Sequence, residues 1–397
     1  MPRFEPFAGL RYAPDRVRLD DVAAPPYDVI SPDEQAALER RSPYNVVRIE
    51  LPRPHDGADR YQAAARHLAE WRQAGILVRD AAPAFYGYAM SFADEAGRPR
   101  QTVGVIGALG LEPPGPAGGI LPHEQTMPKP KGDRLELLRA CRANTSPIWG
   151  LSLTPGLSEL CRPGQEPVAT CTDLDGVVHR CWPITDAAAV DAVSSAVASS
   201  PVVIADGHHR FETALAYRSE RRAEAGAGPH DLVMALVVEL AEDQLTVRPI
   251  HRLISGLPEG FDLVAALAPW FDAIPTHPPD ATLGERLGAA GGMGLVTPQG
   301  TWVLRPRPEL EAVTDTDLDS SRAEAALASL PAHEVTYQHG WDLAAAAVAK
   351  SEAQGALLLR PATVSQIAAT GHGGARMPPK TTFFWPKPRT GVVLREV

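Results

Sequence analysis

The stretch VVIADGHHRFETALAYRSERRAEA at residues 202–225 decides the fold. It begins with the apolar run Val202–Ala205, which is typical of a short buried strand. Asp206 and Gly207 follow, and a helical pattern continues over residues 211–225. A buried strand that leads into a long helix is typical of folds that combine sheets and helices. We therefore predict an α/β fold, with α+β as the alternative.

Strand and helix patterns alternate on both sides of this stretch. Ser31, Pro32 and Glu34 have the spacing of an N-cap, a first helical residue and a capping box. The first 30 residues are predicted to be irregular. Strands are predicted at 46–51, 84–92, 102–111, 148–153, 178–183, 202–205, 232–240, 245–251 and 356–360. Helices are predicted at 31–41, 59–74, 135–142, 186–199, 211–225 and 364–369.

The length of 397 residues is enough for two or three domains. Alanine, proline and glycine increase and polar clusters become rare between about 257 and 330. We therefore predict a main domain at 1–256, a smaller inserted subdomain at 257–330, and a segment at 331–397 that returns to the main domain.

Charge and composition exclude several classes of protein. The net charge is −10, from 38 Lys and Arg against 48 Asp and Glu, which argues against a protein that coats nucleic acid. The N-terminus has no apolar signal segment, and no apolar run approaches the roughly 18 residues of a membrane span. The four cysteines form no CxxC pair. We therefore predict a cytoplasmic protein with reduced thiols and no membrane partner.

The densest polar cluster follows the strand at Val202–Ala205. Gly207 permits a tight turn, and a helix that begins near His208, His209 and Arg210 favours a bound anion. Asp206 stands where a group that accepts a substrate proton would stand. The alternative is that Asp206 only caps the helix and the histidines face solvent.

A second cluster precedes the helix predicted at 135–142. Glu124 is a candidate metal ligand, acid or base, and Lys131 and Arg134 are candidate phosphate contacts. His123 is a candidate substrate contact. The alternative is a solvated loop with local ion pairs.

Three further segments carry candidate residues. The Pro25-Pro26 turn presents Tyr27 and Asp28. Near the C-terminus, Lys380 and Lys387 alternate with threonines and aromatic residues. Asn144 stands in a turn before a predicted strand. The purely structural alternatives are a plain turn for Tyr27 and Asp28, a C-terminal strand docked on a sheet for the lysine segment, and a turn cap for Asn144. His251 and Arg252, at the end of a predicted strand, are a weaker candidate pair.

Six motifs in a fixed order resemble one family. They are APPYDVIS at 24–31, SPYNVVRIELP at 42–52, LPHEQT at 121–126, ANTSPIWG at 143–150, IADGHHRFETAL at 204–215 and MPPKTTFFWPK at 377–387. The chain resembles the domain of unknown function 1015 family over nearly its whole length.

A second resemblance concerns the strand followed by DGHHR and a helix. It is similar to the signature of the ParB/sulfiredoxin superfamily, whose small-molecule members include nucleotide-dependent free serine kinases. The DNA-binding members carry GERR at the corresponding place, where this chain has Asp206–Arg210. The resemblance implies a mixed-sheet core of that type, a role in serine metabolism, and a nucleotide held at the start of the helix.

We predict that the protein transfers phosphate from ATP or ADP, with Mg²⁺, to a small hydroxylated metabolite, with free L-serine as the first candidate. The predicted catalytic residues are Asp206, Glu124 and His208, and Asp206 or Glu124 is the candidate Mg²⁺ ligand. The predicted nucleotide and phosphate contacts are Gly207, His209, Arg210, Lys131, Arg134, Lys380 and Lys387. The predicted substrate contacts are Asp28, Tyr27, His123 and Asn144.

Three alternative functions remain, and one of them, a DNA-binding ParB-like protein, would need a basic face, against which the net charge of −10 argues. A nucleotide-binding regulator would use the same phosphate contacts without turnover. A phosphate-ester hydrolase would use the same carboxylates and histidines with water as the acceptor.

Overall fold

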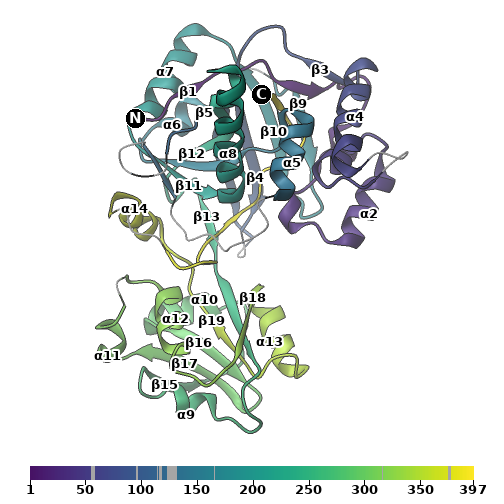
Figure 1. Cartoon of the computed structure of the whole chain (residues 1–397). Helices are drawn as coiled ribbons and strands as arrows, with labels where there is room; N and C mark the ends of the chain where they lie inside the picture. The colour runs from purple at the N-terminus through teal and green to yellow at the C-terminus, as the bar shows by residue number, and fades with distance from the viewer. Residues whose placement is uncertain are drawn as a thin grey trace. The chain divides into compact units, whose positions relative to one another are not determined.

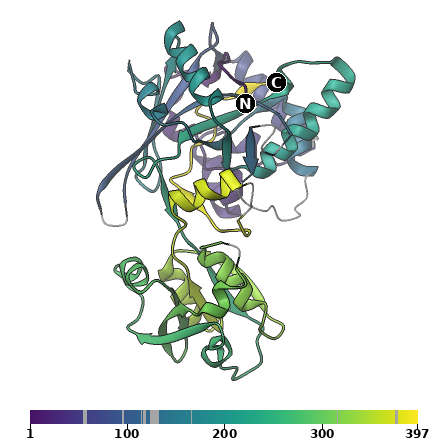
Figure 2. The ribbon, with the colours of Figure 1, turned by 90° about the vertical axis from the view of Figure 1, so that its left-hand side faces the viewer.

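The structure is a computed structural model that describes residues 1–54, 59–94, 97–113, 115, 119–122, 132–164, 166–314, 316–373 and 377–397. These residues form two compact units. The first contains described residues up to Leu245 and, again, Pro386–Val397, and the second contains Thr246–Trp385. Both termini belong to the first unit (Figures 1 and 2).

A mixed nine-stranded sheet forms the centre of the first unit. Its order is β6-β11-β8-β12-β5-β4-β10-β9, and β1 pairs with β5. Strand pairs β11–β6 and β12–β8 are parallel, and the others are antiparallel. The strands are β1 (Phe4–Glu5), β4 (Phe85–Ala93), β5 (Pro99–Gly110), β6 (Ile120–Pro122), β8 (Ile148–Ser152), β9 (Ala169–Thr172), β10 (Val178–Ile184), β11 (Val202–Asp206) and β12 (Leu232–Glu239). The mixed sheet with its helices confirms the predicted α/β class.

Helices and short two-stranded ribbons complete the first unit (Figure 1). Phe211 and Ala214 of α8 share a buried core with Val202 and Ile204 of β11 and with Val237 of β12. Helix α5 lies beside both α4 and α8. The helices are α1 (Leu19–Val22), η1 (Tyr27–Val29), α2 (Pro32–Arg41), α3 (Val47–Glu50), α4 (Arg60–Gln73), α5 (Gly132–Cys141), α6 (Leu157–Leu160), α7 (Ala187–Ala198), α8 (His208–Ala225) and η3 (Pro229–Asp231). The ribbons pair β2 (Leu10–Tyr12) with β3 (Leu77–Arg79), and β7 (Ala143–Asn144) with β21 (Arg395–Glu396).

Most of the predicted helices and strands of this unit are confirmed. In the capping box of α2, Ser31 Oγ accepts from the Glu34 amide and Glu34 Oε2 accepts from the Ser31 amide. Asp59 and Asp186 are N-caps of α4 and α7, where their side chains accept from backbone amides of the first turn without a reciprocal capping box. Helix α8 begins three residues earlier than predicted.

The strand predicted at 46–51 is wrong, because this segment forms helix α3. The Val47 amide donates to Asn45 Oδ1, and the Ile49 and Glu50 amides both donate to the Val46 carbonyl. This local side-chain bond and burial override the strand preference of a β-branched run. The first 30 residues, predicted to be irregular, contain β1, β2, α1 and η1.

The second unit has a six-stranded antiparallel sheet in the order β15-β17-β16-β19-β14-β18. A separate ribbon pairs β13 (Thr246–Arg248) with β20 (Phe383–Trp385). The sheet strands are β14 (Ile250–Ser255), β15 (Phe271–Thr276), β16 (Met293–Thr297), β17 (Gly300–Pro306), β18 (Glu334–His339) and β19 (Gly355–Leu358). The helices are α9 (Leu263–Leu267), α10 (Leu283–Ala290), α11 (Pro308–Glu311), α12 (Asp319–Leu327), α13 (Trp341–Ala349) and α14 (Val364–Gly373).

The division into units differs from the predicted domain boundaries. The predicted subdomain, 257–330, lies within the second unit, but so do 246–256 and 331–385. Strand β14 joins these segments because it is hydrogen-bonded to both β18 and β19. The chain returns to the first unit only at Pro386. No helix among the described residues is both long and apolar enough to span a bilayer.

Candidate functional site

Asp206 is the last residue of β11, at the junction with α8. The pairing of β11 with β8 shifts by one residue here, since Ile204 lies opposite Gly150 whereas Asp206 lies opposite Trp149. A shift of this kind is a bulge, which changes the direction of a side chain at the end of a strand. The strand therefore ends with a carboxylate that is turned out of the regular sheet alternation.

Gly207 connects Asp206 to the helix with φ +87°, a left-handed conformation that favours glycine. A Cβ atom at this position would lie 3.0 Å from Arg210 Nη2 and 3.1 Å from Ile148 Cγ2. Glycine therefore suits the left-handed turn and leaves the Arg210 guanidinium in place, because a side chain here would push it aside by a few tenths of an ångström.

Two cations bind the Asp206 carboxylate. Lys387 Nζ lies 2.5 Å from Asp206 Oδ1, and Arg210 Nη2 lies 3.0 Å from Oδ2. The three side chains are 13% (Lys387), 12% (Arg210) and 19% (Asp206) exposed, so water screens these pairs only weakly. Burial raises the pKa of Asp206, but Lys387, Arg210 and His208 outweigh it and lower the pKa to about 2. Asp206 is therefore ionised at neutral pH.

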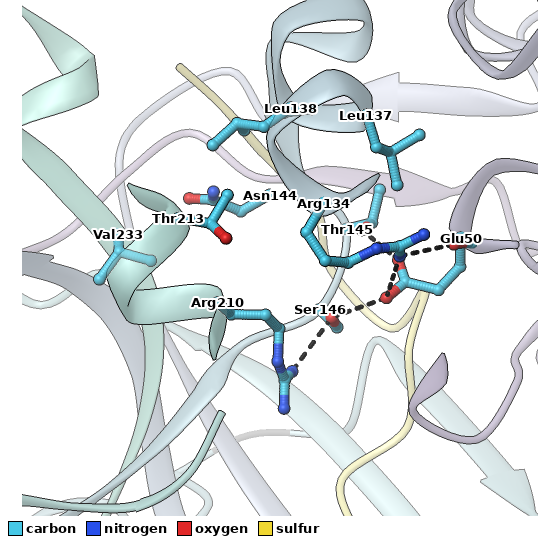
Figure 3. Close-up of a pocket in the computed structure, with 11 residues that line it drawn as sticks. Glu50, Arg134, Leu137, Leu138, Asn144, Thr145, Ser146, Arg210, Thr213 and Val233 are labelled. Atoms are coloured by element: carbon cyan, nitrogen blue, oxygen red, sulfur yellow. Dashed lines mark hydrogen bonds and ion pairs between the residues drawn. The ribbon is translucent and has the colours of Figure 1, made fainter. Parts of the chain in front are cut away.

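Arg210 links Asp206 to a second buried carboxylate. Its Nη1 donates to Ser146 Oγ at 3.1 Å and to the Pro147 carbonyl at 2.5 Å. Ser146 Oγ in turn donates to Glu50 Oε1 at 3.2 Å, and Thr145 Oγ1 donates to Glu50 Oε2 (Figure 3). Glu50 is almost completely buried. The chain of bonds thus runs from α8 through the 145–147 turn to α3.

Arg134 approaches the same carboxylate from α5. Its Nη1 donates to the Glu50 carbonyl at 2.7 Å and lies 3.8 Å from Glu50 Oε1 (Figure 3). Its guanidinium also stacks on Tyr27, 4.5 Å from the ring centroid, and pairs with Asp133. Burial raises the pKa of Tyr27, and nearby Arg210 and Arg134 oppose that increase.

A small pocket of about 50 Å³ lies between α5, α8 and the 143–146 segment. A water molecule needs roughly 10–15 Å³ measured in this way, so the pocket has room for a few waters but not for a nucleotide. Asp206 does not line it. The lining residues are Glu50, Arg134, Leu137, Leu138, Ala143, Asn144, Thr145, Ser146, Arg210, Thr213 and Val233 (Figure 3).

The structure brings several predicted site residues together in the first unit. Asp206 is in direct contact with Arg210 and Lys387. Arg134 is connected to this group through Glu50, and Tyr27 stacks on Arg134. Asp28 is exposed beside Tyr27, close enough that its charge acts on Arg210. His208 and His209, both half-buried, form the first turn of α8.

Other predicted residues lie elsewhere. Asn144 Oδ1 accepts from the Met234 amide at 3.0 Å, which ties β7 to β12, although Asn144 also lines the pocket. Lys380 belongs to the second unit, where it is exposed at φ +60°. His251 is buried in β14, and its Nδ1 accepts from the Leu359 amide. His123, Glu124 and Lys131 lie outside the described residues.

Sequence reasoning did not select Glu50, Thr145 or Ser146 as site residues. Glu50 ends the run VVRIE, in which a charged residue stands next to apolar ones. An acid in such a run is a signal of a buried carboxylate that needs partners. The hydroxyls of Thr145 and Ser146 are those partners here.

The described residues do not form a ready Mg²⁺ site. Both oxygens of Asp206 accept from cationic side chains, and those of Glu50 accept from hydroxyls. Among the residues that the structure describes, no group of three or more His, Cys, Asp or Glu side chains has a metal-binding arrangement.

Arg210 retains one unused donor. Its Nε is buried and has no hydrogen-bond acceptor among the described residues. The N-terminus of an 18-residue helix, α8, adds a partial positive charge at the same place. The arrangement can therefore hold an anionic oxygen beside an ionised carboxylate.

Comparison with known proteins gives one family and several distant structures. No curated protein matches the chain. A free serine kinase in complex with AMP matches at 16% identity and a TM-score of 0.36, over 69% of this chain and 88% of that one. SbnI with a C-terminal truncation from Staphylococcus aureus matches at 11% identity and a TM-score of 0.40, over 72% and 85%. A conserved hypothetical protein from Pyrococcus furiosus matches at 15% identity and a TM-score of 0.36, over 73% and 93%.

At these identities and TM-scores the solved structures bear on neither substrate nor mechanism. The family match covers residues 4–331, which is most of the chain. The protein therefore belongs to the family described as "Protein of unknown function (DUF1015)".

Proposed function

We propose that the protein is a nucleotide-dependent phosphotransferase that acts on a small hydroxylated metabolite. The observation that carries the proposal is the ionised Asp206, held between Lys387 and Arg210 at the start of α8. The similarity of DGHHR to the ParB/sulfiredoxin signature supports the same reaction and names free L-serine as the first acceptor to test. The nucleotide is ATP or ADP.

Asp206 is suited to orienting the acceptor hydroxyl. Phosphoryl transfer proceeds through a loose transition state, so it depends on alignment and charge neutralisation more than on early proton removal. A carboxylate with a pKa of about 2 has little affinity for a proton but remains a strong hydrogen-bond acceptor. It can therefore hold the alcohol in line and take up its proton late in the reaction.

The groups around Asp206 are suited to the transferring phosphoryl group. Arg210 offers its buried Nε–H, and Lys387 brings a positive charge to within 2.5 Å of the carboxylate. His208 and His209, on the first turn of α8, are candidate contacts for the remaining phosphate oxygens. In this proposal Arg134, on the far side of Glu50, stabilises the site rather than contacting phosphate.

Phosphorus NMR of the purified protein tests the reaction. The protein is incubated with Mg²⁺ and ATP or ADP, with and without a pool of amino acids and small hydroxy acids. A phosphomonoester that forms only when an acceptor is present is the expected result, and division of the pool then identifies the acceptor. Phosphate release without an acceptor would favour the hydrolase, and saturable nucleotide binding without turnover would favour the regulator.

Asp206→Asn separates catalysis from binding. We expect this variant to bind nucleotide and to lose at least 100-fold in turnover, in the range for removal of a positioned acid–base group. Asp186→Asn is the matched control, because Asp186 caps α7 and asparagine caps a helix equally well. Unchanged turnover in Asp206→Asn would remove Asp206 from the mechanism.

A further inference from the structure

The C-terminal segment 386–390 carries Lys387 into the site. Lys387 stands between Pro386 and Pro388, whose rings fix φ and which have no amide hydrogen to donate. Because neither proline donates a backbone hydrogen bond, the direction of the Lys387 side chain depends in part on how the backbone is held immediately after Pro388.

Two sets of hydrogen bonds hold that backbone. The Arg389 amide donates to Tyr88 Oη at 3.0 Å. The next residue, Thr390, exchanges backbone hydrogen bonds with Ala24 at 2.9 and 3.2 Å. The bond nearer to Lys387 is thus made by a tyrosine hydroxyl in the middle of β4.

The Tyr88 hydroxyl belongs to a buried chain of three side chains. Tyr88 Oη lies 2.8 Å from His179 Nδ1, and His179 Nε2 lies 3.1 Å from Asp173 Oδ2. The other oxygen of Asp173 accepts from the Asp175 and Val177 amides. The chain connects β4 and β10 to the turn between β9 and β10.

The donors of this chain can be assigned from one end to the other. The ionised Asp173 can only accept, so His179 Nε2 donates to it. A neutral His179 ring then has no hydrogen on Nδ1, which accepts from Tyr88 Oη, while Tyr88 Oη accepts from the Arg389 amide. Burial lowers the pKa of His179 even though Asp173 opposes the decrease, which agrees with the neutral ring.

Tyr88 and His179 are 1% exposed and the Asp173 side chain is 8% exposed, so the three groups offer almost no surface to a substrate. A fully satisfied buried network instead fixes one arrangement of the groups at its ends. One end here is the turn at 173–177, and the other is the Arg389 amide, two residues from Lys387.

We infer that Tyr88, His179 and Asp173 are positioning residues that hold the 386–390 segment so that Lys387 reaches Asp206. The inference rests on the proposed function only where it assumes that Lys387 contacts phosphate. The contact between Lys387 and Asp206 is independent of any reaction.

Amine labelling of the full chain tests this inference. The lysines are at 129, 131, 350, 380 and 387, and Lys350 is an exposed internal reference. The folded protein is treated with an amine-acylating reagent at pH 8, and the labelling rate of each lysine is measured by peptide mass spectrometry. Tyr88→Phe removes one backbone-holding hydrogen bond, so we expect Lys387 to be labelled about fivefold faster relative to Lys350.

Tyr86→Phe is a matched control on the same strand. Its buried hydroxyl accepts from the Gly9 amide and donates to Asp80, with no bond to the 386–390 segment. We expect this variant to leave the Lys387 rate unchanged. Equal rates in the two variants, or an unchanged rate in Tyr88→Phe, would overturn the inference. Labelling needs no nucleotide, so its failure is distinct from failure of the phosphotransferase proposal.

Hydrogen exchange of the wild-type protein gives a second test that does not depend on a variant folding. Lys387 and Arg389 carry the only backbone amide hydrogens in Pro386–Arg389, so this short segment reports on very few sites. We expect the Arg389 amide to exchange at least 100-fold more slowly than in an unstructured peptide. Exchange at the unprotected rate would show that Tyr88 does not hold this segment.

Discussion

The surroundings of Asp206 have opposite effects on its pKa. Burial favours the neutral carboxyl, whereas two cations within 3.0 Å favour the carboxylate, and the cations dominate. The folded-state pKa of about 2 lies below the value near 3.9 of an unfolded chain. The ionised form of Asp206 therefore stabilises the folded protein above the unfolded pKa, and this stabilisation is lost as the pH falls through the folded pKa.

This linkage predicts the pH dependence of the Asp206→Asn variant. The loss in free energy of unfolding, relative to the wild type, should be largest near pH 6. Roughly half of the full contribution of about 2–3 kcal/mol should be lost at pH 3. Urea unfolding of both proteins at pH 6, 4 and 3 measures the difference. A difference that does not change with pH would contradict the lowered pKa.

Gly207 and Gly226, at the two ends of α8, allow the effect of backbone strain to be separated from the effect of side-chain crowding. Both have positive φ, but a Cβ at Gly207 meets Arg210, whereas nothing lies within 4 Å of one at Gly226. We expect Gly207→Ala and Gly226→Ala each to lose about 1–2 kcal/mol of stability. Only Gly207→Ala should displace Arg210 and weaken nucleotide binding, measured by calorimetry. Equal loss of binding in both variants would show that helix stability, not the Arg210 position, controls the site.

At the level of elements, patterns within one segment were predictable and contacts between segments were not. The apolar run before Asp206 predicted β11, and the helical period after it predicted α8. Helix α3 was missed because its β-branched residues favour a strand until the Asn45 side chain and burial are known. That Glu50 meets Ser146 and Arg134 depends on three elements packing together, which no local pattern encodes.

The contribution of the α2 capping box to stability can be predicted from the sequence. Ser31→Ala removes the acceptor for the Glu34 amide, so we expect a loss of about 1 kcal/mol in the free energy of unfolding. Ser219→Ala is the control, because Ser219 lies exposed within α8 and its hydroxyl only donates to the Leu215 carbonyl of the same helix. Alanine has the higher helix propensity, so this control should be neutral or slightly stabilising. Urea unfolding measures both, and equal losses would show that the serine cap contributes nothing specific.

On the scale of the whole molecule, the first unit is built from two separated parts of the chain. Val392, Val393 and Leu394 are buried in it, and the Leu10 and Leu394 backbones are hydrogen-bonded to each other. Burial of three such side chains contributes roughly 6 kcal/mol, which is comparable with the total stability of a typical domain. The first unit should therefore not fold without its C-terminal segment.

The ribbon of β13 and β20 allows this dependence to be tested. Thr246 lies opposite Trp385, so the two boundaries of the second unit are neighbours in an antiparallel pair. A variant that joins Thr246 to Trp385 through Asn-Gly, a two-residue hairpin turn, removes 247–384 and keeps both parts of the first unit. We expect it to unfold cooperatively in urea and to keep Lys387 protected from amine labelling.

The matched variant ends at Leu245 and lacks the C-terminal segment. We expect it to show no cooperative unfolding transition by circular dichroism, because it loses both the buried Val392–Leu394 side chains and the Lys387 contact with Asp206. Cooperative unfolding of this shorter variant with the same midpoint as the joined one would contradict the argument. In that case the 386–397 segment would be an attachment to a unit that is already complete, and the position of Lys387 would have to be fixed by some other contact.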